Sequence, residues 1–140
     1  MSFKRQCSAI ALLAVFLGCS YRKTVDQEEF ISQLKAAVSL CAESRLFVNY
    51  LREGKSSQSF FVGHTRYLQQ LASDDLQDAN KADVPAQLHS QFQVYREQLE
   101  ALSRQLEILQ ASQARSDALT DIDSKLQTIQ GALDHLRSGL

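Results

Sequence analysis

Two regularly spaced series of large apolar residues occupy the C-terminal half of the chain and constrain its fold more than any other feature. Both series alternate steps of three and four residues. They consist of Leu88, Phe92, Tyr95, Leu99, Leu102, Leu106 and Leu109, and of Leu119, Ile122, Leu126, Ile129, Leu133, Leu136 and Leu140. This spacing is typical of helices that bury one stripe against another helix. The two series therefore predict an all-α protein with coiled-coil-like seams.

The segment between the two seams, residues 110–118, has no large apolar residue. The step from Leu109 to Leu119 is out of phase with a continuous heptad repeat. Either the chain turns here, with Ser116 or Asp117 capping a fourth helix, or one long helix contains a phase slip. The lack of Gly and Pro favours the long helix, whereas the separation of the seams favours the turn. We expect the turn and keep the long helix as the alternative.

Two further helices are predicted upstream. Asp26 precedes Glu29 by three residues, as in a capping box, and Gly54 is suited to end the first helix, so we place it at residues 26–53. Its expected apolar stripe comprises Phe30, Leu34, Ala37, Val38, Cys41, Val48 and Leu51, widened by Ile31, Leu46 and Phe47. Ser56 or Ser57 is expected to cap the second helix, which ends by Asn80. Its expected apolar face comprises Phe60, Phe61, His64, Tyr67, Leu68, Leu71, Ala72 and Leu76.

The third helix is expected to begin at residues 83–85, where Pro85 suits a first turn and Asp83 can accept from a free amide. Short loops between helices make neighbours antiparallel. The sequence therefore predicts one domain at residues 26–140, an antiparallel bundle of three to four helices. The seams are expected to pair within the chain, although the same surfaces can pair with a helix of another chain.

The N-terminus has the organisation of a secretory signal peptide. Lys4 and Arg5 are followed by an apolar run at residues 9–17, which is shorter than the roughly 20 residues that span a bilayer. The run ends in Leu17-Gly18-Cys19-Ser20, which resembles the lipobox of bacterial lipoproteins. Phe16 stands where the best examples of that family have Leu.

This resemblance implies that residues 1–18 are a lipoprotein signal peptide and that Cys19 becomes the lipidated N-terminus. In the family, that cysteine carries a diacylglycerol thioether and a third acyl chain, and several acyl chains anchor a protein stably. Residues 19–25 would then be a short tether. Ser20 in place of Asp implies transport to the outer membrane, with the domain facing the periplasm.

The composition of the remaining chain excludes several partners and cross-links. Removal of the signal changes the formal net charge from −1 to −3 because it contains two basic and no acidic residues. A mildly acidic chain is a poor candidate for nucleic acid binding. Cys41 is the only cysteine left besides Cys19, so an internal disulfide framework is not expected.

The sequence lacks the motifs of most helical-bundle chemistries. No Glu lies three residues before His64, His89 or His135, and neither a haem-attachment motif nor a glycine-rich phosphate loop is present. We therefore expect no catalytic site, cofactor or metal. Asp74, Asp75 and Asp78, and Asp121 with Asp123, lack the pattern of a calcium loop and are interpreted as solvated acidic helix ends.

Several single residues have both a structural and a functional interpretation. His64 is expected to be a boundary histidine rather than a ligand-contacting group, and His89 and His135 to flank the seams. Cys41 is expected to be a small core residue rather than half of a cross-chain disulfide. The aromatic residues are expected in the core, with an apolar-ligand pocket as the alternative; they are Phe60, Phe61, Tyr67, Phe92 and Tyr95.

These expectations combine into one functional hypothesis. The chain is expected to be a non-catalytic envelope lipoprotein, anchored through Cys19, that docks on a protein partner or on itself through a helical face. The alternative is a bundle that binds an apolar small ligand or an unfolded client protein.

Overall fold

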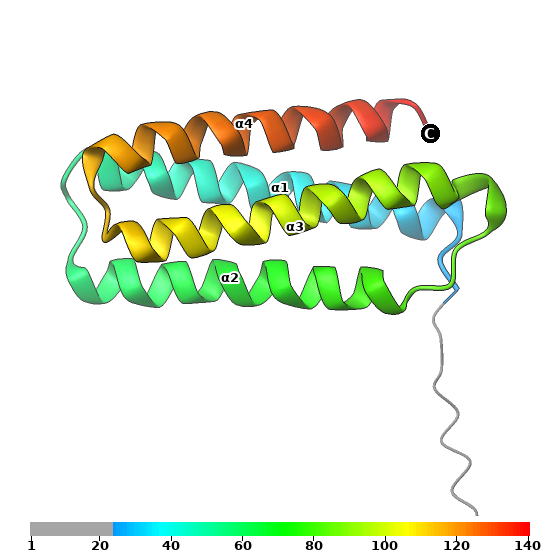
Figure 1. Ribbon diagram of the computed structural model, residues 1–140, viewed down its shortest axis with the longest axis horizontal. Coiled ribbons are helices and arrows are strands. Elements are labelled where there is room, and N and C mark those ends of the chain that lie inside the picture. Colours follow the sequence, from blue (N-terminus) through cyan, green and yellow to red (C-terminus); the bar gives the residue numbers. More distant parts are fainter. Residues whose placement is uncertain (1–23) are drawn as a thin grey trace, which may run out of the picture.

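The protein is a bundle of four long helices in the computed structural model, which describes residues 24–140 (Figure 1). The expected signal peptide, Cys19 and most of the expected tether lie outside the described residues. The helices are α1 (Gln27–Arg52), α2 (Gln58–Lys81), α3 (His89–Ser112) and α4 (Ser116–Ser138), and a short 3₁₀ turn, η1 (Ala86–Leu88), precedes α3. The all-α prediction is confirmed.

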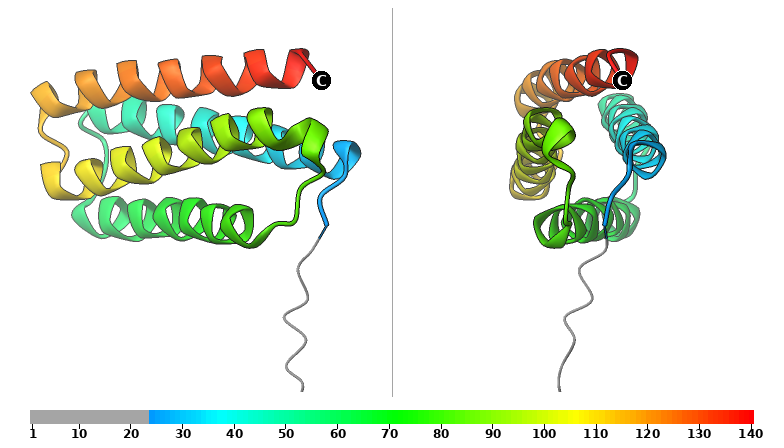
Figure 2. Two further views of the ribbon diagram at one scale, coloured as in Figure 1. Left: turned by 45° about the vertical axis from the view of Figure 1, so that its right-hand side comes forward. Right: turned by 90° about the vertical axis from the view of Figure 1, so that its right-hand side faces the viewer.

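Successive helices run in opposite directions, and the end-on view places them at four corners (Figure 2). α1 packs mainly against α4, and α3 packs against both α2 and α4. α1 and α2 are joined by a short loop but contact each other less. The antiparallel bundle predicted from the loop lengths is therefore confirmed, with its loosest side between α1 and α2.

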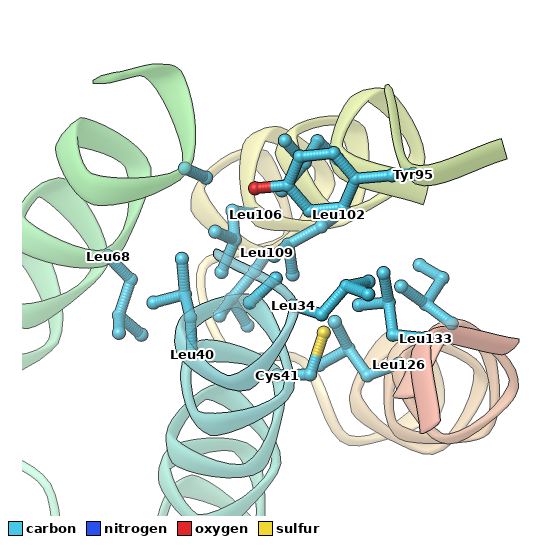
Figure 3. Packing of buried hydrophobic residues seen from close by; sticks show 14 of the residues in the cluster. Leu34, Leu40, Cys41, Leu68, Tyr95, Leu102, Leu106, Leu109, Leu126 and Leu133 are labelled. Atoms are coloured by element: carbon cyan, nitrogen blue, oxygen red, sulfur yellow. The ribbon is translucent and has the colours of Figure 1, made fainter. Parts of the chain in front are cut away.

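The two seams form the interior of the bundle. All seven residues of the first seam are buried, and so are the five from Leu119 to Leu133 in the second. They pack with Leu34, Leu40 and Cys41 of α1 and with Leu68 of α2 (Figure 3). Internal pairing of the seams is confirmed, and these residues are not available to another chain unless the bundle opens.

The predicted boundaries of the first two helices are confirmed at atomic level. The Asp26 side chain accepts from the Glu29 amide at 2.8 Å, and the Ser57 side chain accepts from the Phe60 amide at 3.2 Å. Each satisfies an amide that lacks a partner within its helix. Gly54 follows α1 with a φ of +68°, the left-handed conformation that glycine adopts most easily.

The turn between the seams is also confirmed, and it forms without glycine. Gln113 and Ala114 have φ values of 50° and 60°. The Ser112 side chain accepts from the Ala114 amide at 3.2 Å, and the Arg115 amide donates to the Ser112 carbonyl at 3.2 Å. These bonds compensate for the strained backbone and end α3.

The expected caps of the last two helices are wrong. Pro85 precedes η1 without a side-chain cap, and the carbonyl of Asp83 instead accepts from the Val25 amide at 2.9 Å. Arg115 occupies the N-cap position of α4, so Ser116 and Asp117 already belong to its first turn. In both cases a backbone interaction fixes the entry of the chain, and the Asp117 side chain pairs with Arg115 at 4.0 Å instead of capping α4.

Thr24 and Val25, which the sequence analysis placed in the expected tether, contact the folded domain. Thr24 forms an isolated bridge with Asp83, and Val25 is only 1% exposed. The other chain end lies on the same side of the bundle, where the Gln27 side chain donates to the carbonyl of Leu140 at 2.7 Å. Both ends of the described chain therefore lie at the end opposite the α1–α2 loop (Figure 1).

Candidate functional site

Four of the six exposed large apolar residues found in residues 24–140 gather at one end of the bundle. Leu46 and Tyr50 lie near the end of α1, and Phe60 and Tyr67 lie near the start of α2; their exposed fractions are 71, 39, 47 and 50%. The other two, Val94 and Ile108, lie on α3. We call the surface formed by Leu46, Tyr50, Phe60, His64 and Tyr67 the aromatic surface.

Ring contacts hold the aromatic surface together. Phe60 stacks on His64 with centroids 5.4 Å apart and meets Tyr50 edge-on at 5.7 Å. Phe47 lies beneath them, 4.5 Å from the His64 ring and 5.8 Å from the Phe60 ring. Such geometries restrain aromatic side chains beyond simple burial. The surface is therefore preorganised.

A shallow groove of about 200 Å³ runs across this surface, between the end of α1 and the start of α2. Its lining is apolar except for Glu43 and His64. The Glu43 Oε1 atom lies 3.5 Å from the His64 Nε2 atom, and the Glu43 side chain is 43% exposed. The groove thus offers an apolar floor with one accessible carboxylate at its edge.

The sequence did not predict this surface, because it placed Leu46 in the apolar stripe of the first helix and Phe60, His64 and Tyr67 in that of the second, and it assigned no role to Tyr50. On α2 the buried stripe is Phe61, Thr65, Leu68 and Ala72, and Phe60 and Tyr67 point outward. On α1, Phe47 is buried as expected, but Leu46 is exposed. Two apolar stripes on one helix that are offset by one residue have the same spacing. The spacing alone therefore does not show which stripe faces the core.

His64 belongs to the aromatic surface, whereas the other two histidines and the other aromatic residues named from the sequence lie apart from it. His64 is a boundary residue as predicted, with a side chain 24% exposed. His89 is exposed at the start of α3, with its Nε2 atom 2.6 Å from the Val84 carbonyl oxygen, and His135 is exposed near the end of α4. Phe61, Phe92 and Tyr95 are core residues, so the five aromatics do not form one pocket.

Cys41 is a core residue, as expected. It is fully buried, and burial, with a smaller contribution from Asp134, raises the pKa of its thiol to about 12. The thiol is therefore protonated and inaccessible at neutral pH. A cross-chain disulfide at this position would require the bundle to open.

The interpretation of Asp123 as a solvated helix end is wrong. Its side chain is 18% exposed, and its Oδ1 atom lies 3.0 Å from the Arg45 Nε atom across the α1–α4 interface. Asp121 is exposed and pairs with Lys125 one turn along α4 at 2.8 Å. The two aspartates therefore belong to different ion pairs.

Two absences hold for residues 24–140. No group of three or more His, Cys, Asp or Glu side chains is arranged to hold a metal ion in this part of the chain. Within the same residues, no helix is both long enough and apolar enough to cross a bilayer.

Comparison of the chain with protein-family models, curated proteins and solved structures finds no match.

Proposed function

We propose that this protein is a bacterial envelope lipoprotein, anchored through lipid on Cys19, that acts as a non-catalytic docking module. Its anchor keeps it at the membrane, on the periplasmic side of the outer membrane. The aromatic surface is the site where it binds a protein partner. The single observation that carries the docking function is the gathering of four exposed large apolar side chains at one end of the bundle.

The size of the aromatic surface supports a transient partner rather than an obligate one. Three half-exposed aromatic rings and Leu46 offer on the order of 400 Å² at roughly 150–250 Å² per aromatic side chain. A patch of this size is often functional on a monomer. A typical stable interface takes about 800 Å² from each partner, so the remainder would come from a polar rim.

The groove supports a specific anchor chemistry. A partner that inserts an aliphatic or aromatic side chain beside a basic one would fill the apolar floor and pair with the accessible carboxylate of Glu43. Interfaces typically derive most of their affinity from a few such anchors.

The position of the surface supports docking away from the membrane. α1 begins next to the tether, and Leu46 lies 19 residues beyond Gln27, roughly 30 Å at 1.5 Å per residue. Residues 20–23 add a short link to Cys19. The lipid would therefore hold one end of the bundle while the aromatic surface faces a partner at the other end.

The second candidate function is binding of an apolar small ligand or an unfolded client protein, because the groove is aromatic and accessible. Its volume of about 200 Å³ is below the roughly 300–1,000 Å³ of small-molecule sites. This size is better suited to one inserted side chain than to a whole ligand.

Photo-crosslinking in the source bacterium tests the docking function. A benzoylphenylalanine residue replaces Phe60 or Tyr67 in the full chain, and the matched control places it at Ile108, which is 44% exposed on α3. We expect one discrete crosslinked product from the first two positions and none from Ile108. The crosslinked protein, once purified, should bind the full chain and lose at least about tenfold in affinity with Phe60→Glu.

Other crosslinking results would contradict this proposal. Equal products from Ile108 would mean that the aromatic surface has no special role. A product of twice the mass of the chain would indicate self-association, and a broad mixture would indicate unfolded clients.

Replacement of Cys19 tests the anchor separately. We expect Cys19→Ser to release the protein from the membrane fraction and to abolish the mass added by the acyl chains. Firm membrane association with an unchanged N-terminal mass would refute lipidation and leave the docking proposal to its own test.

A further inference from the structure

A second cavity, distinct from the aromatic surface, lies at the end of the bundle where the chain enters. It has a volume of about 260 Å³ and is lined by Val25, by Glu29 and Gln33 of α1, by Asp75, Asp78 and Lys81 of α2, by Ala82, and by Tyr95 of α3. It lies between α1 and α2, which are the neighbouring helices with the weakest contact in the bundle, and reaches α3. This volume is below the roughly 300–1,000 Å³ of sites for drug-sized ligands, but a single water needs only about 10–15 Å³, so the cavity has room for a ligand of a few heavy atoms.

The charge of the cavity is unbalanced. Apart from Glu29, which has partners of its own, its lining carries the two carboxylates of Asp75 and Asp78 and the one ammonium group of Lys81. Among the ion pairs and hydrogen bonds of residues 24–140, none involves the carboxylate of Asp75 or Asp78, whereas Glu29 accepts from Gln33. Burial raises the pKa of the Asp75 carboxyl group, and repulsion from the carboxylates of Asp78 and Asp74 adds to this effect. The site therefore favours a cation.

Polar groups that face the cavity give independent evidence for a ligand. The Tyr95 residue is only 2% exposed, lines the cavity, and forms no hydrogen bond with the described residues. Its hydroxyl points from α3 toward α2 (Figure 3). Gln33, which also lines the cavity, has a buried Oε1 atom without a partner. Buried polar atoms normally have partners, and leaving one without a partner costs about 1–3 kcal/mol.

The available groups suit an organic cation better than a metal ion. An ammonium group carries three donors, which match the Asp75 and Asp78 carboxylates and the Tyr95 hydroxyl. The apolar sides of Val25 and Ala82 suit a short aliphatic chain. Calcium takes six to eight oxygen ligands, and no cluster of three carboxylate, histidine or cysteine groups with metal-binding geometry is found in residues 24–140.

We propose that this cavity binds a small aliphatic amine through Asp75, Asp78 and the Tyr95 hydroxyl. The site lies next to the entry of the tether and at the opposite end of the bundle from the aromatic surface, so this inference does not depend on the docking function.

Calorimetric titration of the full chain in neutral detergent with 1,4-diaminobutane tests the proposal. We expect saturable binding, and none for 1,4-butanediol, which has the same chain length without the charge. Tyr95→Phe keeps the ring in the core and should weaken binding about tenfold or more, because it removes a hydrogen bond to a charged group. Asp75→Asn with Asp78→Asn should abolish detectable binding.

A double variant with the same charge change serves as the control. Asp117→Asn with Asp121→Asn removes two exposed carboxylates of α4 and should leave binding within about twofold at physiological salt, because such charges are screened. Circular dichroism verifies that each variant is folded.

Four results would overturn the proposal. They are absence of saturable diamine binding, equal binding of the diol, equal loss in the control variant, and binding of Mg²⁺ or Ca²⁺ in place of the amine. Diamine binding that appears only after Arg22 and Lys23 are replaced by Gln would also overturn it, because the cavity would then serve the chain's own basic segment.

Discussion

At the scale of single residues, Asp75 is where stability and ligand binding oppose each other. Burial raises the pKa of its carboxyl group, and the carboxylates of Asp78 and Asp74 add to this effect. The unfolded chain therefore releases this proton at a lower pH than the folded chain. The contribution of Asp75 to stability is complete below its pKa in the unfolded chain and is lost as the pH rises through its pKa in the folded state.

Asp75→Asn is expected to stabilise the bundle at neutral pH, because the amide removes the repulsion and the cost of burying a charge. The free energy of unfolding should rise by up to about 1 kcal/mol at pH 7, after allowance for solvent screening. The gain should disappear below about pH 3, where the carboxyl group is protonated in both states. Urea denaturation at the two pH values measures the difference.

Asp74→Asn is the control for this prediction, because Asp74 is exposed and accepts a hydrogen bond from Gln70 at 2.8 Å. It should not increase stability. A loss of stability in Asp75→Asn at pH 7, or an equal gain at both pH values, would show that Asp75 is not under electrostatic strain.

At the scale of helices, the Arg45–Asp123 pair links α1 to α4 with both side chains less than one-third exposed. Arg45 also donates to the Gln130 side chain at 3.3 Å, so Asp123→Asn would leave a partly buried charge without its partner. We expect a loss of about 1–2 kcal/mol in the free energy of unfolding, measured by urea denaturation.

The exposed pair on the same helix provides the comparison. Asp121→Asn removes an ion pair with Lys125 in which both side chains are at least half exposed, and it should cost only about 0.3–0.5 kcal/mol. Equal losses in the two variants would mean that the α1–α4 pair contributes no more than a surface pair.

Replacing a glycine by alanine is expected to have opposite effects on stability at a helix end and inside a helix. Gly54 has a φ of +68°, so Gly54→Ala should destabilise the α1–α2 loop by about 1 kcal/mol. Gly131 lies within α4, where an added β-carbon would meet only open space, so Gly131→Ala should stabilise the bundle by about 0.5–1 kcal/mol. Thermal unfolding followed by circular dichroism distinguishes the two signs. Stabilisation by Gly54→Ala would contradict the C-terminal role of that glycine.

The sequence predicted where the helices lie in the chain better than it predicted which of their faces is buried and how α3 and α4 begin. Local patterns of neighbouring residues determine the seams that begin at Leu88 and Leu119 and the caps at Asp26 and Ser57. Such patterns can be recognised in the sequence alone. The entry into η1 depends on a bridge between Thr24 and Asp83, far apart in the chain, which local patterns do not contain.

The candidate sites were less predictable than the fold for the same reason. The outward rotation of Phe60 depends on how α2 meets α1 and α3. The cavity at Tyr95 depends on three helices and was not predicted, because Tyr95 has the spacing of an ordinary core residue.

At the scale of the whole molecule, the two candidate sites lie toward opposite ends of the bundle. The amine cavity lies where the chain enters from the tether, and the aromatic surface lies at the α1–α2 loop end. The seams occupy the interior between them, so they are not available for assembly. A protein of this design presents two separate surfaces and a closed core.

The central claim is that the seams are closed within one chain. The solution mass of residues 20–140, measured by light scattering during size-exclusion chromatography, tests this claim most directly. A monomer at micromolar concentration is the expected result, because the seams are satisfied within one chain and the aromatic surface alone is too small for a stable dimer. Phe60→Glu should leave that mass unchanged. A dimer or larger assembly would contradict the closed bundle and indicate that the seams at residues 88–109 and 119–140 pair between chains.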